Sequence, residues 1–320
     1  MKKRFYRFYY SLLNDKAKQA YDELYDGFSN MKKSFKITKL EEKDFKDVFE
    51  FLMLDNPLIF YLNSYTYIIS NTDITINPDY LFTMDEVNKY LTDILNKCQR
   101  YRNINKLSDY DFLVELNSLL NNDIKYVDNQ SHEIHTIIGS LFNGKAVCDG
   151  ISKLFKLVCD LNNIKCIVAV GKSNRSYDRA SFYNHAWNKV EVNGSWVNVD
   201  ITANITLSNK VRHDYLFLSD NQIKNSHIES YKTHSCINDN LNYYYVNDLV
   251  FYKKAALFDY LEQCLKNGKY YIEFKIPATK DINALADNVM EVIERVAYKL
   301  KLYRSFSFEY NLDQLVFAVI

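Results

Sequence analysis

The 320-residue sequence has no excess of either charge and no long apolar run. Lysine plus arginine and aspartate plus glutamate number 40 each, so phosphate-driven binding to nucleic acid is disfavoured. No segment approaches the ~18 apolar residues of a membrane span. The basic stretch at residues 1–10 lacks the apolar core and cleavage site of a signal peptide. These absences predict a cytoplasmic protein with no nucleic-acid partner and no membrane span, and they leave the oligomeric state open.

The six cysteines form neither a disulfide framework nor a metal site. They show no CxxC pair and no metal-ligand spacing, and they are too sparse for a small secreted scaffold. His132 and His135 could supply two metal ligands, but no third residue completes a zinc pattern. An oxygen-rich calcium loop of the EF-hand type is also absent from the sequence. The sequence therefore predicts no metal and no cofactor.

Glycine and proline are scarce, with 7 and 3 residues, and glycine is concentrated in the central third of the chain. The five glycines found there are at positions 139, 144, 150, 171 and 194. Gly144 and Gly150 bracket Cys148, after which apolar residues recur at helical spacing to Leu161. Cys148 is therefore predicted in the first turn of an amphipathic helix, where unpaired N–H groups and the helix dipole favour a thiolate.

A histidine and an aspartate follow on a predicted β-hairpin. The segments His185–Val192 and Ser195–Ile201 have strand character, and Asn193-Gly194 is a strong signal for a two-residue turn. In that register Asp200 is the diagonal cross-strand neighbour of His185, ~7–8 Å away between backbones and on the same face of the sheet. The opposite face is rich in valine and is predicted to meet the core. The spacing thus predicts a His–Asp pair.

Two runs, His135 to Gly150 and His185 to Asp200, resemble the bacterial transglutaminase-like superfamily, and a looser likeness continues to His227. The resemblance implies an α+β fold with a papain-like core, in which a nucleophile helix packs on an antiparallel sheet. It also implies a catalytic triad. In that triad Cys148 is the nucleophile, His185 the general base and acid, and Asp200 the orienting carboxylate.

Four further residues are predicted to contact substrate. Trp187 and Trp196 lie on the predicted triad face of the hairpin, where packing is the plainer alternative. His135 matches a position that is often histidine in the family, so it lines the site or donates a structural hydrogen bond. Tyr183 ends a polar connection over residues 171–184, which is predicted to overhang the site as a loop; an ordinary surface loop is the alternative.

Three units are predicted along the chain: a mostly helical region over 1–82, the catalytic domain over 83–238, and a small α+β domain over 239–320. The elements expected in the outer units are helices over 12–28, 40–54, 255–264 and 281–300, and strands over 58–69, 243–251 and 270–276. Capping signals also start helices at Thr83 and Ser108. The last unit carries no nucleophile or ligand cluster, so docking, oligomerisation or substrate presentation is its expected use.

The predicted reaction is cysteine-dependent acyl transfer on an amide bond of a protein or peptide substrate, through a thioester intermediate. Hydrolysis by a peptidase, amidase or deamidase is favoured, and cross-linking of glutamine to an amine is the alternative. A third hypothesis is a binding or scaffold protein with a vestigial triad. The oxyanion is expected to contact the Cys148 N–H and one further donor, for which His135 or the 139–147 segment is a candidate.

Overall fold

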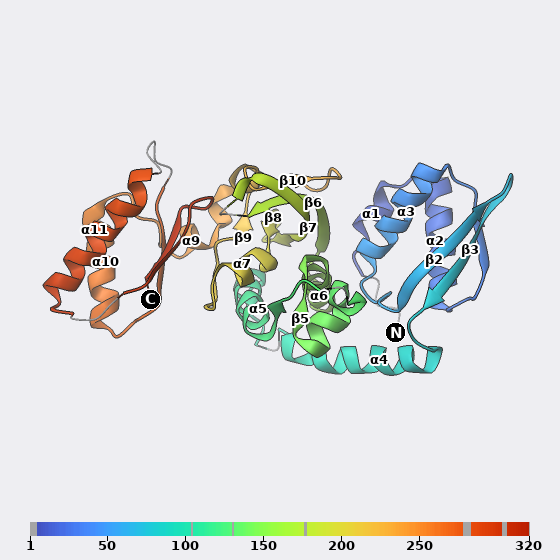
Figure 1. Cartoon of the computed structure of the whole chain (residues 1–320), viewed down its shortest axis with the longest axis horizontal. Helices are drawn as coiled ribbons and strands as arrows, with labels where there is room; N and C mark the ends of the chain where they lie inside the picture. The colour runs from blue at the N-terminus through green and yellow to red at the C-terminus, as the bar shows by residue number, and fades with distance from the viewer. Residues whose placement is uncertain are drawn as a thin grey trace.

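In a computed structural model the chain forms three units in a row (Figure 1). The structure describes residues 5–103, 105–129, 131–175, 178–277, 283–302 and 306–319. The N-terminal unit lies at one end, the central unit carries the largest sheet, and the C-terminal unit lies at the other end. Within the described ranges, no helix is both long and apolar enough to cross a membrane.

The N-terminal unit packs helices against a small sheet. Its helices are α1 (Phe8–Leu12), α2 (Asp15–Ser29) and α3 (Glu42–Asp55), and its strands are β1 (Phe35–Thr38), β2 (Leu62–Ile69) and β3 (Asp73–Tyr80). The sheet is antiparallel, in the order β1-β3-β2. Asn14 starts α2 by accepting a hydrogen bond from the Ala17 N–H, and α3 ends just before Pro57. The sequence indicated α2, α3 and β2, but gave no signal for α1, β1 or β3.

Two capped helices lead into the central unit. Thr83 and Glu86 form a capping box at the start of α4 (Met84–Lys97), which is followed by a 3-10 turn, η1 (Cys98–Tyr101). Ser108 caps α5 (Asp109–Asp123) by accepting from the Asp111 N–H. Both helices begin where the sequence predicted them to begin. Figure 1 shows α4 running from the N-terminal unit toward the central one.

The central unit is a five-stranded antiparallel sheet packed on one long helix, α6 (Cys148–Leu161). The strands are β6 (Cys166–Arg175), β7 (Asp178–Val192), β8 (Ser195–Val199), β9 (Leu216–Leu218) and β10 (His227–Glu229), in the order β10-β6-β7-β8-β9. Short elements complete it: β4 (Lys125–Tyr126), β5 (Lys145–Ala146), η2 (His132–His135), η3 (Gly139–Asn143), α7 (Ile201–Leu207) and α8 (Asp220–Ile223). The valine-rich face of the β7–β8 hairpin is buried in the main core.

The β7–β8 hairpin has the predicted register, but its second strand ends earlier than predicted. Val192 pairs with Ser195 around the Asn193-Gly194 turn, and the ladder runs to the Asn188–Val199 pair. Pairing stops there because Asp200 leaves the strand to become the N-cap of α7. The predicted strand over Ser195–Ile201 is therefore too long by two residues.

The predicted loop over residues 171–184 is also wrong. Residues 171–175 extend β6 and residues 178–184 extend β7, and the two extensions pair, with Gly171 opposite His185 and Ser173 opposite Tyr183; residues 176 and 177 lie outside the described ranges. The main-chain ladder carries this extension, although its side chains are mostly polar. A hairpin with polar residues on both faces gives no alternating apolar pattern, so the sequence signal for a strand was missing.

The C-terminal unit places two helices against a three-stranded sheet (Figure 1). It contains η4 (Asp239–Leu241), α9 (Tyr243–Val246), α10 (Lys254–Lys266), β11 (Ile272–Lys275), α11 (Asn283–Lys299), β12 (Phe308–Asn311) and β13 (Val316–Val319), with sheet order β11-β13-β12. The strand predicted over 243–251 is wrong, because the first part of it is α9. The Asn242 side chain accepts from the Tyr244 N–H and so starts a helical turn there.

We expect Gly150→Ala to destabilise the central unit. A Cβ at this position in the first turn of α6 would lie 2.3 Å from the carbonyl oxygen of Ile134 in η2. That neighbour is backbone and cannot rotate away, so the free energy of unfolding should fall by about 1–3 kcal/mol in urea titration. Gly268→Asn is the control, since open space surrounds Gly268 and asparagine tolerates its positive φ. An unchanged unfolding midpoint for Gly150→Ala would show that η2 can shift to make room for the added methyl group at little cost in stability.

Candidate active site

Cys148 is the first residue of α6, as the sequence predicts. The start of this helix is held against η2, because the Val147 N–H donates to the Ile134 carbonyl at 3.1 Å. Ser140 Oγ donates to the Gly150 carbonyl at 3.1 Å from the other side. As a first-turn residue, Cys148 has an N–H group with no acceptor inside the helix, so the positive end of the helix dipole faces the thiol.

Two buried polar contacts fix α6 against β7, the strand that carries His185. Ser152 Oγ donates to the Ala186 carbonyl at 3.1 Å, and Asn188 Nδ2 donates to the Ser152 carbonyl at 3.0 Å. Both side chains are buried, so each contact is shielded from water. These hydrogen bonds lie close in the chain to Cys148 on α6 and to His185 on β7. They therefore help to set the distance between the thiol and the imidazole. No sequence pattern marks Ser152 or Asn188 as residues of the site.

The structure brings Cys148, His185 and Asp200 together. His185 Nε2 lies 2.7 Å from Asp200 Oδ2, and the Cys148 thiol lies close enough to the same ring to help raise its pKa. Because Nε2 is directed at the carboxylate, Nδ1 is the ring nitrogen left for the thiol. Asp200 reaches His185 from the N-cap of α7, where its Oδ1 accepts from the Ala203 N–H at 2.9 Å. The sequence predicted that Asp200 would reach His185 as its diagonal neighbour across the hairpin. In the structure Asp200 instead reaches it from beyond the end of β8, as the N-cap of α7.

Charge pairing outweighs burial for both members of the His–Asp pair. Burial by itself lowers the pKa of the His185 imidazole, but the charge of Asp200 and hydrogen bonds to Asp200 and Cys148 raise it to about 10. Burial by itself raises the pKa of Asp200, yet His185 and His227 hold it below its usual range. At neutral pH the pair is therefore an imidazolium and a carboxylate.

His227 is a second histidine on Asp200 that the sequence analysis placed only at the edge of the family likeness. Its Nε2 lies 3.0 Å from Asp200 Oδ2, and its Nδ1 lies 2.9 Å from Ser226 Oγ. Burial lowers the pKa of His227, although the Asp200 hydrogen bond and charge oppose the shift. A carboxylate only accepts, so Nε2 carries a proton and donates to Asp200, while Nδ1 faces the Ser226 hydroxyl, which donates to the Ile223 carbonyl at 3.0 Å. No local sequence motif marks this role, because β10 reaches the site only through sheet pairing with β6.

His135 and Trp187 also lie beside the triad. The His135 ring, half exposed, has its Nδ1 3.0 Å from Oδ1 of Asp149, the residue after Cys148. That hydrogen bond raises the pKa of His135 despite partial burial. Trp187 stacks on His185, with ring centroids 6.2 Å apart, but only 2% of it is exposed. Its indole N–H donates to Asn198 Oδ1 at 3.1 Å.

The other two predicted contact residues lie in different surroundings. Trp196 stacks on His234 with ring centroids 3.9 Å apart and packs beside Tyr6, so its ring contacts are with the N-terminal segment and His234. Tyr183 is on β7, two residues before His185 and on the same face of the strand. Its side chain is 48% exposed. Of these two, Tyr183 is the one that has accessible surface next to His185.

The His185–Asp200–His227 group has a composition that a divalent metal could use, with one ligand atom of each within 4.8 Å of the others. In the structure these same atoms are hydrogen-bonded to one another, so each histidine directs its Nε2 at the shared carboxylate oxygen. A metal would need lone pairs where the hydrogen bonds need N–H groups. The geometry fits a proton network better than a metal site, and the metal-free site stays a prediction.

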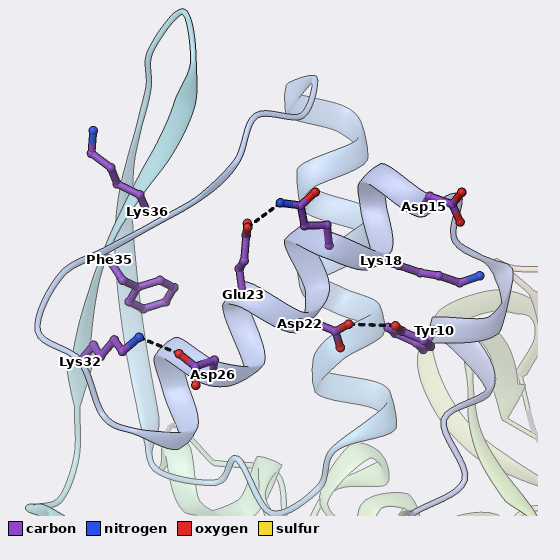
Figure 2. Close-up of a pocket in the computed structure, with 10 residues that line it drawn as sticks. Tyr10, Asp15, Lys18, Asp22, Glu23, Asp26, Lys32, Phe35 and Lys36 are labelled. Carbon is purple, nitrogen blue, oxygen red and sulfur yellow. Dashed lines mark hydrogen bonds and ion pairs between the residues drawn. The ribbon is translucent and has the colours of Figure 1, made fainter.

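A groove of about 670 Å³ lies on the N-terminal unit, between α2 and the β1 segment (Figure 2). Its lining includes no residue of the triad or of the predicted substrate contacts. Lys32 forms an ion pair with Asp26 along it, at 2.6 Å. Tyr10 donates to Asp22 there at 2.8 Å. The groove is therefore a feature of the N-terminal unit, separate from the chemistry around Cys148.

Comparison with known proteins identifies the fold of the central segment. Residues 99–201 match the family model of the transglutaminase-like superfamily, and this segment includes Cys148, His185 and Asp200. The resemblance seen in the sequence is thereby confirmed, and so is the fold class: mixed helix and sheet with a transglutaminase-like, papain-like domain. No curated protein matches the chain.

Two solved structures are similar to part of the chain. One is a TGase, 16% identical with a TM-score of 0.31, where the match covers 47% of this chain and 47% of that chain. The other is described as a candidate cysteine protease from Cytophaga hutchinsonii, 11% identical with a TM-score of 0.28, covering 43% of this chain and 61% of that one. The chain thus spans less than two thirds of the length of either.

Because of the His185–Asp200 pair, we expect the free energy of unfolding to fall at alkaline pH. Because folding raises the pKa of His185 from 6.5 to about 10, the stabilisation is complete below pH ~6.5 and is lost as the pH rises through about 10. Urea unfolding at pH 6, 8 and 10 should show a decline on the order of a few kcal/mol beyond that of His185→Gln. Identical declines for the two proteins would contradict a strongly raised imidazole pKa.

Proposed function

We propose that this protein is a cysteine-dependent acyl-transfer enzyme that acts on amide bonds of a protein or peptide, with hydrolysis as its main reaction. The observation that carries the proposal is the position of the His185 ring, which lies 2.7 Å from Asp200 and close enough to Cys148 for the thiol to raise the pKa of the imidazole. A nucleophile, a base and a group that orients the base are the parts that covalent catalysis needs. The transglutaminase-like fold of this segment supports the same chemistry.

In the first half of the reaction Cys148 becomes acylated. The Cys148 thiolate attacks the amide carbonyl carbon, forming a C–S bond and placing negative charge on the carbonyl oxygen. The Cys148 N–H, which as a first-turn group has no acceptor within α6, is the donor we assign to that oxygen. His185 then gives its Nδ1 proton to the leaving nitrogen as the C–N bond breaks, which releases an amine and leaves a thioester.

In the second half an acceptor resolves the thioester. Neutral His185 takes a proton from water, the resulting hydroxide attacks the thioester carbon, and the C–S bond breaks to regenerate the thiolate. An amine acceptor would follow the same course and give a cross-linked or transamidated product. Asp200 keeps its charge throughout and holds the ring with Nδ1 toward the sulfur. His227 supports this by donating to the same oxygen, which we assign as a positioning role.

The alternative is a non-catalytic function, in which the triad has only a structural role and the domain binds peptides. Burial distinguishes the thiols: Cys148 is half-buried, whereas the other five cysteines are buried. Exposure alone would therefore direct a small alkylating agent to Cys148. The dependence of its reactivity on pH and on His185 separates a catalytic thiolate from a merely accessible thiol.

We expect iodoacetamide to label Cys148 selectively and to do so even at pH 6–7, with mass spectrometry locating the modified residue. An ordinary thiol, with a pKa of ~8.5, loses most of its reactivity below pH 7 because it is protonated. The paired imidazolium should keep Cys148 reactive there, and His185→Ala should abolish this reactivity. Slow labelling of Cys148 with the profile of a free thiol, unchanged in His185→Ala, would overturn the proposal.

We expect Cys148→Ala to abolish turnover with little loss of fold, because no other group can form the thioester. The assay pairs a quenched fluorescent peptide library, for hydrolysis, with a glutamine peptide plus a labelled primary amine, for cross-linking. Cys98→Ala is the matched control, since it removes a buried thiol of η1, outside the site. Full turnover in Cys148→Ala would remove it as the nucleophile, and amine incorporation exceeding hydrolysis would make cross-linking the main reaction.

We expect Asp200→Asn to lower kcat by about two to four orders of magnitude, because the amide favours the wrong ring tautomer and removes the charge that stabilises the imidazolium. His227→Gln should cost less, because His185 still has its carboxylate partner. Steady-state kinetics with the best substrate from the screen measures both. Equal rates for wild type and Asp200→Asn would show that another group orients His185.

A further inference from the structure

The central and C-terminal units meet around a buried arginine, Arg212, in the segment between α7 and β9. Only 1% of Arg212 is exposed. Its Nε and Nη2 donate to the two carboxylate oxygens of Asp214, each at 2.9 Å. From the C-terminal unit, Glu273 of β11 lies 3.2 Å from Nε and Glu309 of β12 lies 3.3 Å from Nη1. A buried guanidinium must be paired in this way, because an unpaired charge is costly to bury.

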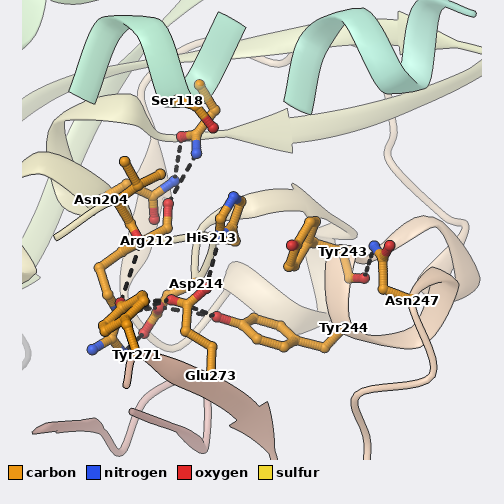
Figure 3. Close-up of polar contacts among 12 residues, drawn as sticks. Ser118, Asn204, Arg212, His213, Asp214, Tyr243, Tyr244, Asn247, Tyr271 and Glu273 are labelled. Carbon is orange, nitrogen blue, oxygen red and sulfur yellow. Dashed lines mark hydrogen bonds and ion pairs between the residues drawn. The ribbon is translucent and has the colours of Figure 1, made fainter. Parts of the chain in front are cut away.

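Glu273 is the carboxylate that connects the two units most closely (Figure 3). Besides its contact with Arg212, its Oε2 lies 2.7 Å from Nδ1 of His213. Two tyrosines of the C-terminal unit, Tyr244 and Tyr271, donate their hydroxyl groups to its Oε1 at 3.3 and 3.2 Å. One buried carboxylate thus holds two consecutive residues of the central unit.

The segment held by Glu273 is tied to α7 through two asparagines, both fully buried. Asn117 of α5 donates its Nδ2 to the Arg212 carbonyl at 2.9 Å and accepts from Asn204 Nδ2 at 3.0 Å. Asn204, in α7, accepts from the Tyr215 N–H at 2.9 Å. Figure 3 draws Asn204 and Arg212 within this network. The position of α7 relative to the Arg212 segment is therefore fixed by side-chain hydrogen bonds.

The same segment holds the backbone of Asp200 directly, since the Asp200 N–H donates to the Tyr215 carbonyl at 2.9 Å. The β7–β8 ladder cannot do this, because it ends at the Asn188–Val199 pair. Asp200 is therefore placed by α7 and by the Arg212–Tyr215 segment, and that segment is clamped by Glu273. A displacement of about 1 Å at a reacting group is enough to cost roughly 10²-fold in rate.

We infer that the C-terminal unit positions Asp200, with Glu273, Arg212 and His213 as positioning residues for the triad. The inference rests on the proposed function, because it assigns a use to the C-terminal unit within the same site. The unit is then part of the catalytic apparatus, which differs from the docking, oligomerisation or substrate-presentation uses expected from the sequence. None of the three residues touches Cys148 or His185 in the interactions described above; they act through the placement of Asp200.

The test is Glu273→Gln in the full chain, which keeps the size of the side chain but removes its charge. The readouts are the iodoacetamide rate of Cys148 at pH 6.5 and the alkaline midpoint of the His185 ring in an NMR titration. We expect the rate to fall at least about tenfold and the His185 midpoint to move to lower pH. Tyr271→Phe removes one donor to Glu273 and the contact of the same hydroxyl with the Val211 carbonyl, and it keeps the charge of Glu273. It should shift both readouts less, in the same direction, even if Glu273→Gln does not fold.

Two controls separate positioning from a general loss of stability. Val48→Ala opens a cavity in α3 of the N-terminal unit and should lower Tm without changing either readout. Glu291→Gln removes an exposed ion pair with Lys254 in the C-terminal unit and should change neither. If Glu273→Gln and Tyr271→Phe lower Tm but leave both readouts as in wild type, the inference is overturned while the proposed function stands. If wild-type Cys148 itself reacts as a free thiol, the proposed function is overturned, and the inference with it.

Discussion

The site depends on one buried carboxylate that accepts from three donors. Only 1% of Asp200 is exposed, and a charge buried to that degree is stable only when every oxygen is paired. The donors are the Ala203 N–H at the start of α7, His185 on β7 and His227 on β10. Three separate elements, α7, β7 and β10, must therefore meet at one side chain. Their convergence leaves His185 with its other nitrogen toward Cys148.

The nucleophile is fixed by a different set of contacts. Backbone packing between Gly150 and η2 sets the start of α6, and the hydrogen bonds of Ser152 and Asn188 set its distance from β7. The C-terminal unit adds a further constraint, because Glu273 pairs with Arg212 in the segment that holds the Asp200 backbone. The helix, the sheet and the C-terminal unit thus each contribute one constraint on the geometry of the triad.

Local signals in the sequence were reliable where they fixed the backbone by themselves. The Asn193-Gly194 turn and alternating valines predicted the register of the β7–β8 hairpin, which the structure confirms. The same signals failed at Asp200, because its carboxylate caps α7 and so ends the strand early. They also failed over 171–184 and 243–251. Polar strands have no alternating apolar pattern, and the tyrosines after Asn242 suit a strand as well as a helical turn that starts with a cap.

By itself the sequence determined the helix that begins at Cys148, the hairpin that carries His185, and a likeness to the transglutaminase-like superfamily that its family model confirms. These follow from short-range rules of periodicity, turn chemistry and motif. Only the tertiary structure decided that His227 joins Asp200 and that the C-terminal unit reaches the Arg212 segment. These contacts join residues far apart in the chain, and their energy comes from pairing buried charges, which no local pattern of residues records.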